Sequence, residues 1–449
     1  MTDIPTARLN TTRWRGKNVS AFLGLTLICL ACCISSRAET KGPSAAKGQW
    51  SQTPIWQLDL RPFGYGSASK IPMLPRYREA VERIFFTSDD VLTATFVTPV
   101  ADTSPAVGNR PKRAAAWRLH AVFIEATTGR VRTTREWSVA SPECRLLPVA
   151  GGALLLFVPG RLVLYSLDIE LMKELSLSPL KLTAGDVPEV LQSPSRKTIL
   201  LKHYSNENFA AREGWFKGHY DFMWIDAQSL DVVRSWGEDE KENPWQKPKY
   251  VNALGGSVST ISDSEIAWGV NGAILIRRPD QPWRLICYLR PECSTPQFVS
   301  NENLLTFFNM RASPISEDAV AVLRENGSLL LKHQIACREN DLLGRPVVSA
   351  GGRRFALLVY GEGGEIDFMD FHLRSARQTL RDVRVFDIPS RHWVYSLQAK
   401  KKIKGIAGDP FPLQGLALSP DGSQMAILTG DVLEVFRLPS SYSTPRTER

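Results

Sequence analysis

The stretch from Leu416 to Pro439 reads LALSPDGSQMAILTGDVLEVFRLP, and it contains three short apolar runs separated by two turn signals. Ser-Pro-Asp-Gly ends the first run and Thr-Gly-Asp separates the second from the third. Both signals are typical of tight turns between β-strands. A sheet of three strands leaves one edge without a partner, so we expect a fourth strand elsewhere in the chain.

The same element recurs along the 449 residues: a strand, a turn rich in Ser, Asp, Asn or Gly, and a very apolar strand. Besides the stretch above, six copies occur, at 84–96, 146–157, 190–201, 258–268, 298–308 and 347–359. A second, more polar pair of strands follows most copies, and in one of them Asn326-Gly327 predicts a two-residue hairpin with positive φ values.

Four strands in each of seven units predict an all-β fold, a seven-bladed β-propeller of four-stranded antiparallel blades. Two separate β-sandwiches are the alternative, and they do not account for seven similar copies. Only residues 77–86 have a pattern that is compatible with a short helix.

The missing fourth strand of the last blade has one candidate. Residues 440–449 do not fit, because they are polar and contain Pro445, which interrupts a strand. In residues 54–60, PIWQLDL, polar and apolar side chains alternate as in a strand, and this segment belongs to none of the other blades. We therefore expect residues 54–60 to lie beside residues 432–438 and to close the ring.

The segment LALSPDGSQMAIL resembles the WD40-like (PD40, TolB-type) β-propeller repeat, in which Ser-Pro-Asp-Gly turns the first strand of a blade into the second. The sequence Gln192-Ser-Pro-Ser195 is a partial echo of the same motif. The resemblance implies a propeller fold for most of the chain, and it implies no activity.

The first residues have the layout of a secretory signal peptide. A basic segment ends at Lys17, an apolar run covers 21–34, and Ser36-Arg37-Ala38 places small residues before a cut. The sequence thus predicts a signal peptide at 1–38, a flexible linker at 39–53, one propeller domain at 54–439 and a disordered tail at 440–449. A secreted or periplasmic protein is expected, and the alternative is an anchor formed by an uncleaved signal or a lipid.

Charge and cysteine content limit the partners. The net charge is +9, but no basic run is interleaved with aromatic residues, so a nucleic-acid partner is not expected. A monomer without cofactor, metal or mature transmembrane domain is predicted. In an oxidising compartment four cysteines are disulfide candidates with three pairings open: Cys144, Cys287, Cys293 and Cys337.

The longest connections of the predicted blades all fall on one face of the disc, because loops on alternate sides join successive antiparallel strands. Binding residues are frequent on loops that a rigid scaffold holds. The ligand-binding candidates there are Arg113, Arg212, Trp215, Phe216, His219, Trp245, Asp367, Asp370 and His372.

The sequence contains neither a Gly-x-Ser-x-Gly nor a His-Glu-x-x-His motif, and no catalytic residue is assigned. Residues 125–129 with Trp137 are only faintly similar to the docking repeat of quinoprotein dehydrogenases, and we interpret them as blade packing. The predicted function is a binding or scaffolding module for a protein, peptide or glycan. The alternative is an extracytoplasmic enzyme with its site at the channel mouth, either a polymer hydrolase or lyase or a quinone-dependent oxidoreductase.

Overall fold

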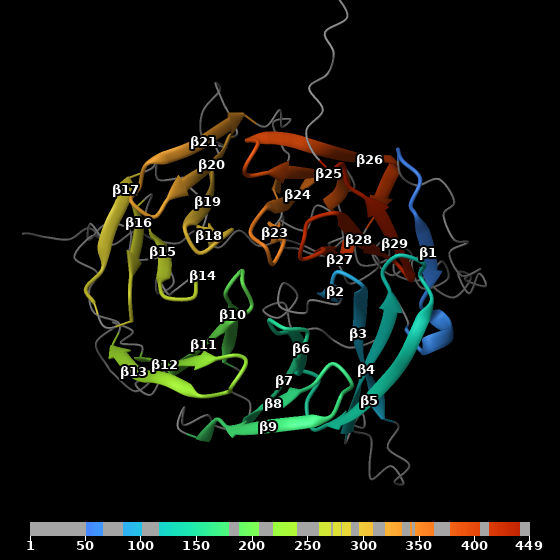
Figure 1. The fold of residues 1–449 in the computed structure, drawn as a ribbon, viewed down its shortest axis with the longest axis horizontal. Coiled ribbons are helices and arrows are strands. Elements are labelled where there is room, and N and C mark those ends of the chain that lie inside the picture. The colour runs from blue at the N-terminus through green and yellow to red at the C-terminus, as the bar shows by residue number, and fades with distance from the viewer. Residues whose placement is uncertain are drawn as a thin grey trace, which may run out of the picture. The chain divides into compact units, whose positions relative to one another are not determined.

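Seven small antiparallel sheets stand around a common axis in the computed structural model (Figure 1). The chain is therefore a seven-bladed β-propeller, as the repeats predict. All described residues lie in the larger of two compact units, Gly48–Arg449. The structure describes residues 51–65, 84–100, 116–178, 188–205, 219–239, 260–270, 273–279, 281–288, 296–308, 319–334, 342–343, 346–362, 378–404 and 413–440.

The first three blades follow one another from the centre outward in chain order. Blade 1 consists of β2 (Ile84–Ser88), β3 (Val91–Val100), β4 (Ala116–Glu125) and β5 (Val131–Val139). Blade 2 consists of β6 (Arg145–Pro148), β7 (Leu154–Val158), β8 (Arg161–Tyr165) and β9 (Leu171–Ser176). Blade 3 consists of β10 (Glu189–Gln192), β11 (Thr198–Ser205), β12 (His219–Asp226) and β13 (Val232–Asp239).

The next three blades repeat this order, and in blade 6 two short strands share the innermost position. Blade 4 consists of β14 (Thr260–Ile261), β15 (Ile266–Val270), β16 (Ala273–Arg277) and β17 (Arg284–Tyr288). Blade 5 consists of β18 (Gln297–Phe298), β19 (Asn303–Phe308), β20 (Ala319–Arg324) and β21 (Leu329–Gln334). Blade 6 consists of β22 (Leu342–Leu343), β23 (Val347–Val348), β24 (Arg354–Glu362), β25 (Gln378–Asp387) and β26 (His392–Lys404).

Blade 7 joins the two ends of the propeller. It consists of β27 (Leu413–Leu418), β28 (Gln424–Thr429) and β29 (Val432–Arg437), and β1 (Trp56–Asp59) pairs antiparallel with β29, with Trp56 opposite Val435. The Trp56 indole N–H also donates to the Ala126 carbonyl of blade 1 at 2.7 Å. The predicted closure of the ring by residues 54–60 is confirmed.

The hydrophobic core lies between the blades. In β7 the side chains of Leu155 and Phe157 pack toward blade 3, and those of Leu154 and Leu156 pack toward blade 1. All four are at most 4% exposed. A strand that is buried on both faces needs apolar residues at every position, and this explains why the second strand of each blade reads as a continuous apolar run.

The Ser-Pro-Asp-Gly motif forms the turn between β27 and β28. The Gly422 N–H donates to the Ser419 carbonyl at 2.9 Å, and the Ser419 hydroxyl donates to Asp421 Oδ1 at 2.6 Å. Gly422 has a φ of +74°, a conformation that costs a residue with a side chain about 1–2 kcal/mol. The motif therefore fixes the reversal between the first two strands of the blade.

The turn at Asn326-Gly327 differs from the predicted hairpin. Of the two, only Gly327 has a positive φ, +82°, and its N–H donates to the Arg324 carbonyl at 2.8 Å. The pairing then shifts register at the start of β21, where Leu330 is the extra residue, so the turn is a longer one followed by a bulge. A register shift of the same kind lies near the start of the outer strand in six blades, and it sharpens the twist of each outer strand.

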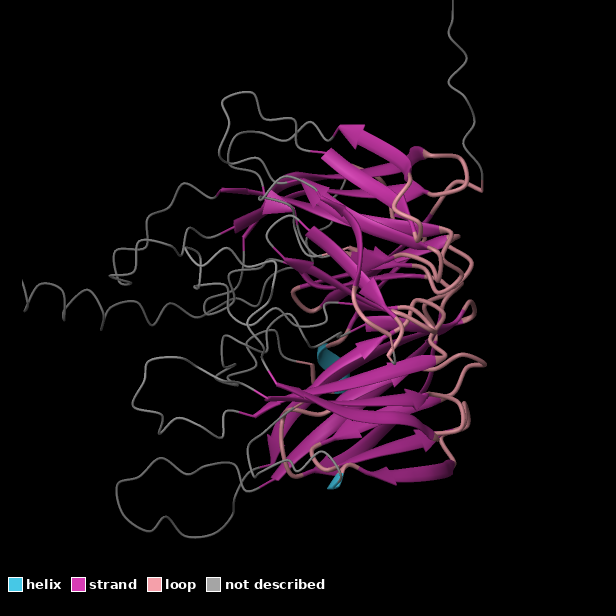
Figure 2. Cartoon of the chain, turned by 90° about the vertical axis from the view of Figure 1, so that its left-hand side faces the viewer, coloured by secondary structure: helices cyan, strands magenta, loops and turns pink. Residues whose placement is uncertain are grey.

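Two faces of the disc follow from the antiparallel order. One face carries the short turns that join the first strand of a blade to the second and the third strand to the fourth, such as 149–153 and 419–423. We call it the turn face, and Figure 2 shows the described loops gathered on this side in pink. We call the opposite one the connection face. No helix among the described residues is long and apolar enough to cross a membrane. The expectation of a short helix at 77–86 is wrong for residues 84–86, which belong to β2. Residues 77–83 lie outside the described residues.

Candidate functional site

The connections with the longest gaps between described strands all leave from the connection face. Besides the link from Asp59 to Ile84, they join Val100 to Ala116, Ser205 to His219, Asp239 to Thr260, and Glu362 to Gln378. Eight of the nine predicted ligand-binding residues belong to these connections and lie outside the described residues: Arg113, Arg212, Trp215, Phe216, Trp245, Asp367, Asp370 and His372. The ninth, His219, is the first residue of β12, where its backbone pairs with Ser205.

Two of the four disulfide candidates are free thiols, the buried Cys144 and the half-buried Cys287. They belong to different interblade clusters, so they are not partners of each other. Burial raises the pKa of the Cys144 thiol to about 12, which keeps it protonated and unreactive at neutral pH. Cys293 and Cys337 lie outside the described residues, so a disulfide between these two stays a prediction.

The innermost strands line the central axis and carry few titratable groups. Among the described residues of these strands, only Arg145 and Glu189 are titratable. Glu189 forms an ion pair with Lys202 of β11, and Lys202 is only 8% exposed. The described residues contain no group of three or more side chains that are suited to a metal ion.

A hydroxyl, an imidazole and a carboxylate form a hydrogen-bonded chain at the connection-face end of blade 1. Thr98 Oγ1 lies 2.8 Å from His120 Nε2, and His120 Nδ1 lies 3.0 Å from Glu136 Oε1. The three residues occupy neighbouring strands β3, β4 and β5. We call this chain the His120 relay.

The surroundings of the His120 relay favour a neutral imidazole. The ring stacks on Phe96 with centroids 4.7 Å apart, and Tyr65 meets Phe96 edge-on at 5.3 Å. Desolvation by burial lowers the pKa of His120 below 6.5, although the neighbouring Glu136 acts to raise it. Since the carboxylate only accepts hydrogen bonds, the Nδ1 proton points at Glu136, and Nε2 is left to accept from the Thr98 hydroxyl.

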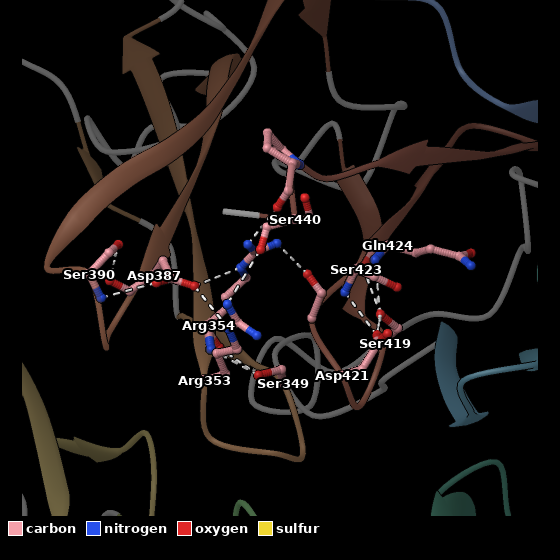
Figure 3. A network of polar contacts seen from close by, with 12 residues as sticks. Ser349, Arg353, Arg354, Asp387, Ser390, Ser419, Asp421, Ser423, Gln424 and Ser440 are labelled. Carbon is pink, nitrogen blue, oxygen red and sulfur yellow. Dashed lines mark hydrogen bonds and ion pairs between the residues drawn. The ribbon is translucent and has the colours of Figure 1, made fainter. Parts of the chain in front are cut away.

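A buried polar network lies on the turn face, at the junction of blades 6 and 7 (Figure 3). Its centre is Arg354, which is 2% exposed. The guanidinium donates to Asp387 Oδ1 at 3.0 Å and to the carbonyls of Gly422 and Pro439, each at 2.6 Å. Arg353 adds a second donor to Asp387 at 3.2 Å.

This network has a structural role, because the Arg354 guanidinium and the Asp387 carboxylate both bond to other groups of the protein. Burial acts to raise the pKa of Asp387, but hydrogen bonds from Arg354, Ser390 and Arg353 outweigh it and lower the pKa below 3.8. The paired charges tie β24 and β25 to the turn after β27. We therefore assign the network to interblade cohesion rather than to ligand binding.

A pair of carboxyl groups bridges blades 7 and 1 on the same face. The Asp421 N–H donates to Asp89 Oδ1 at 2.9 Å. Desolvation, together with repulsion from Asp421, raises the pKa of Asp89. Desolvation also acts on Asp421, but hydrogen bonds from Ser419 and Ser423 prevail and lower its pKa. A proton on this pair therefore resides on Asp89.

The His120 relay and the Arg354 network have no linear motif, and sequence reasoning missed both. Thr98, His120 and Glu136 become neighbours only through the pairing of β3 with β4 and of β4 with β5. The signal that exists is weak: a histidine inside a strand whose flanking strands carry Thr and Glu.

No protein-family model and no curated protein matches the sequence. Solved structures with a similar fold include an oligogalacturonate lyase in complex with manganese, at 14% identity and a TM-score of 0.43, with 73% of this chain and 86% of that chain covered. The WD40 domain of Neurospora crassa Pan2 shares 12% identity over 88% of this chain and 96% of that domain, with a TM-score of 0.41.

A third similar structure, the acylaminoacyl peptidase of Pyrococcus horikoshii, has 10% identity and a TM-score of 0.45, with 79% of this chain and 50% of the peptidase covered. Enzymes and a WD40 domain thus occur side by side among the similar structures. At these values the likeness is one of architecture, and we base no argument about ligand or activity on it.

Proposed function

We propose that the chain is a secreted or periplasmic propeller that binds a protein, peptide or glycan ligand through its connection face. A propeller is a rigid scaffold, and a binding or scaffolding role is consistent with it. The supporting observation is the asymmetry of the two faces: the turn face carries short, internally bonded turns, whereas the longest gaps between described strands open on the connection face. Loops on a rigid frame are where binding residues concentrate.

The test is capture of a partner by the mature chain from the envelope or culture medium of its own cells. A double variant, Trp215→Ala with Phe216→Ala, removes aromatic anchors from the connection between β11 and β12. We expect it to lose the captured partner, whereas the control Leu329→Arg on the outer strand β21 keeps it. Equal capture by both variants would contradict binding at the connection face.

Export is tested separately by the mass of the mature protein. A signal peptide that is cleaved after Ala38 leaves Glu39 as the first residue. A retained or lipidated N-terminus gives a larger mass and supports an anchored protein instead.

A second candidate is a hydrolase, and the His120 relay favours it. A neutral imidazole between a hydroxyl and a carboxylate has the order of groups that a general base requires. Turnover of p-nitrophenyl acetate above the buffer rate, lost in both His120→Gln and Thr98→Val, would support this candidate. Absence of turnover in the natural chain would leave binding as the function.

A further inference from the structure

Two glutamate residues meet on the turn face at the junction of blades 4 and 5. Glu265 directly precedes β15, and Glu325 directly follows β20. Two residues further into each strand, Ala267 and Leu323 belong to the apolar cluster that packs between these two blades. Because successive side chains of a strand point to opposite faces, Glu265 and Glu325 are directed into the same junction.

The Glu265 side chain is buried without a donor. The residue is 5% exposed, although glutamate is rarely fully buried unless it is paired. Its backbone is held in place, since the Glu265 N–H donates to Ser262 Oγ at 3.0 Å. Its side-chain oxygen Oε2 is also buried, and no hydrogen-bond donor among the described residues reaches it. An ionised carboxylate in such a place is costly, so the geometry favours a protonated carboxyl group in this junction.

The charged groups around Glu265 have opposing effects on its proton. Burial is the largest effect and raises the pKa of Glu265, and the facing carboxyl group of Glu325 raises it further. The guanidinium groups of Arg284 in β17 and of Arg278 after β16 act in the other direction and do not outweigh this. Arg284 is also shared, because its Nη2 lies 3.6 Å from Glu325 Oε1. The pair therefore keeps a proton at a pH at which an exposed glutamate is ionised.

A proton fits between these carboxyl groups better than a metal ion does. One carboxyl O–H that donates to the other carboxylate gives both groups a hydrogen bond. Calcium takes about six to eight oxygen ligands, whereas the described residues contain no group of three or more side chains that are suited to a metal ion. The positive charge of Arg284 beside Glu325 also repels a cation.

The turn of residues 324–328, which carries Glu325, is closely packed against blade 4. A Cβ atom added at Gly327 would lie 2.5 Å from the Ile286 carbonyl oxygen of β17. Within blade 5, the Glu325 N–H donates to the Glu302 carbonyl at 3.0 Å. Two ionised carboxylates in this junction can therefore move apart only if the turn itself moves away from blade 4.

We propose that Glu265 and Glu325 share one proton across the junction, and that release of this proton loosens the turn of residues 324–328 from blade 4. In that step one carboxyl O–H bond breaks, the proton passes to water and two carboxylates remain. A carboxyl group with a raised folded pKa contributes stability that is present below its ordinary value of 4.5 and is lost as the pH rises through the folded pKa. This pH-sensitive contact lies on the turn face, so it is independent of the ligand proposed for the connection face.

The test is amide exchange of the mature chain, followed by mass spectrometry at pH 5 and pH 8 and corrected for the intrinsic effect of pH on exchange. We expect the protection of residues 324–328 to fall at least threefold from the lower to the higher pH. Glu265→Gln keeps a hydrogen-bond donor in the junction at every pH, so the fall should disappear, and Glu325→Gln should have the same effect. The control is Glu302→Gln, an exposed residue in another turn of blade 5, and it should keep the fall.

Carboxyl-carbon NMR of the chain labelled at glutamate gives a second reading. The resonance that disappears in Glu265→Gln should titrate above the range of exposed glutamates. Titration of this resonance in the ordinary range, or an equal fall of protection in Glu265→Gln and the natural chain, would overturn the proposal. So would a gain of protection at 324–328 on addition of calcium at pH 8 that Glu265→Gln abolishes, because a cation rather than a proton would then join the two carboxyl groups.

Discussion

Replacing Arg354 by methionine removes the guanidinium at the junction of blades 6 and 7 while keeping most of the side-chain volume. Three acceptors then lose their donor: the Asp387 carboxylate, the Gly422 carbonyl and the Pro439 carbonyl. Asp387 is 3% exposed, so water does not replace the lost donor freely. The substitution therefore leaves a buried charge with only part of its hydrogen bonds.

The expected loss follows from these contacts. Breaking a buried ion pair by removing one partner costs about 3–5 kcal/mol, and the buried Gly422 carbonyl without a donor adds about 1–3 kcal/mol. Pro439 is exposed, so water can replace the donor to its carbonyl. Arg353 still donates to Asp387 at 3.2 Å, and this contact offsets part of the loss. We expect the free energy of unfolding to fall by about 4 kcal/mol, a large share of the 5–15 kcal/mol that is typical of domains.

The assay is urea unfolding followed by circular dichroism, with an unchanged m-value as the check that the same surface unfolds. The double variant Arg354→Met with Asp387→Leu removes both charges and should recover about 2 kcal/mol of the loss, since residues in one network couple by about 0.5–3 kcal/mol. A single variant within about 1 kcal/mol of the natural chain, or no recovery in the double variant, would refute the reasoning.

The pH dependence gives a second reading of the same contact. Because the pKa of Asp387 is lowered below 3.8, its ionisation contributes stability that is present above pH 3.8 and is lost as the pH falls through the folded pKa. In Arg354→Met this contribution should shrink, so the loss of stability between pH 5 and pH 3 should be smaller than in the natural chain.

Three other substitutions probe separate junctions. Gly422→Ala should cost more than Gly430→Ala in urea unfolding, because both have positive φ, but only at Gly422 would the added Cβ meet a neighbour, the Arg354 side chain at 3.0 Å. At His120 the folded pKa lies below 6.5, so the natural chain should lose stability as the pH falls from 7 through this pKa, and His120→Gln should lose less. Asp89→Asn should raise the melting temperature at pH 7.5 and have little effect at pH 3.5, because desolvation and then repulsion by Asp421 raise the pKa of Asp89, and both act only on its ionised form.

The sequence was sufficient for the architecture because the fold repeats. Each second strand is buried on both faces, so its continuous apolar run can be recognised from the local sequence alone. The Ser-Pro-Asp-Gly sequence at 419–422 likewise predicts its own turn, in which Gly422 has a positive φ. The orphan strand at 54–60 could be placed because a ring has only one open edge. The prediction of a two-residue hairpin at Asn326-Gly327 was wrong, because the bulge after the turn depends on the twist of the whole blade rather than on the two turn residues.

The polar sites could not be predicted, because they are made by contacts between strands and between blades. The Arg354 network joins groups up to 85 residues apart, and no local pattern marks them. The exposure of Leu171, Met172, Val232 and Val233 was equally hidden, because these residues have an ordinary strand pattern, and only the outer position of β9 and β13 shows that they are exposed.

The closed ring is tested most directly by a disulfide across its clasp. Gln57 of β1 lies opposite Glu434 of β29, and directly opposed residues of antiparallel strands have Cα atoms about 4.5–5.5 Å apart, within the range that a disulfide spans. After oxidation of Gln57→Cys with Glu434→Cys and proteolysis, we predict one cross-linked peptide that contains both ends of the propeller. A double variant that stays reduced, or whose two introduced cysteines form a disulfide only between molecules, would contradict the closure of the ring by β1.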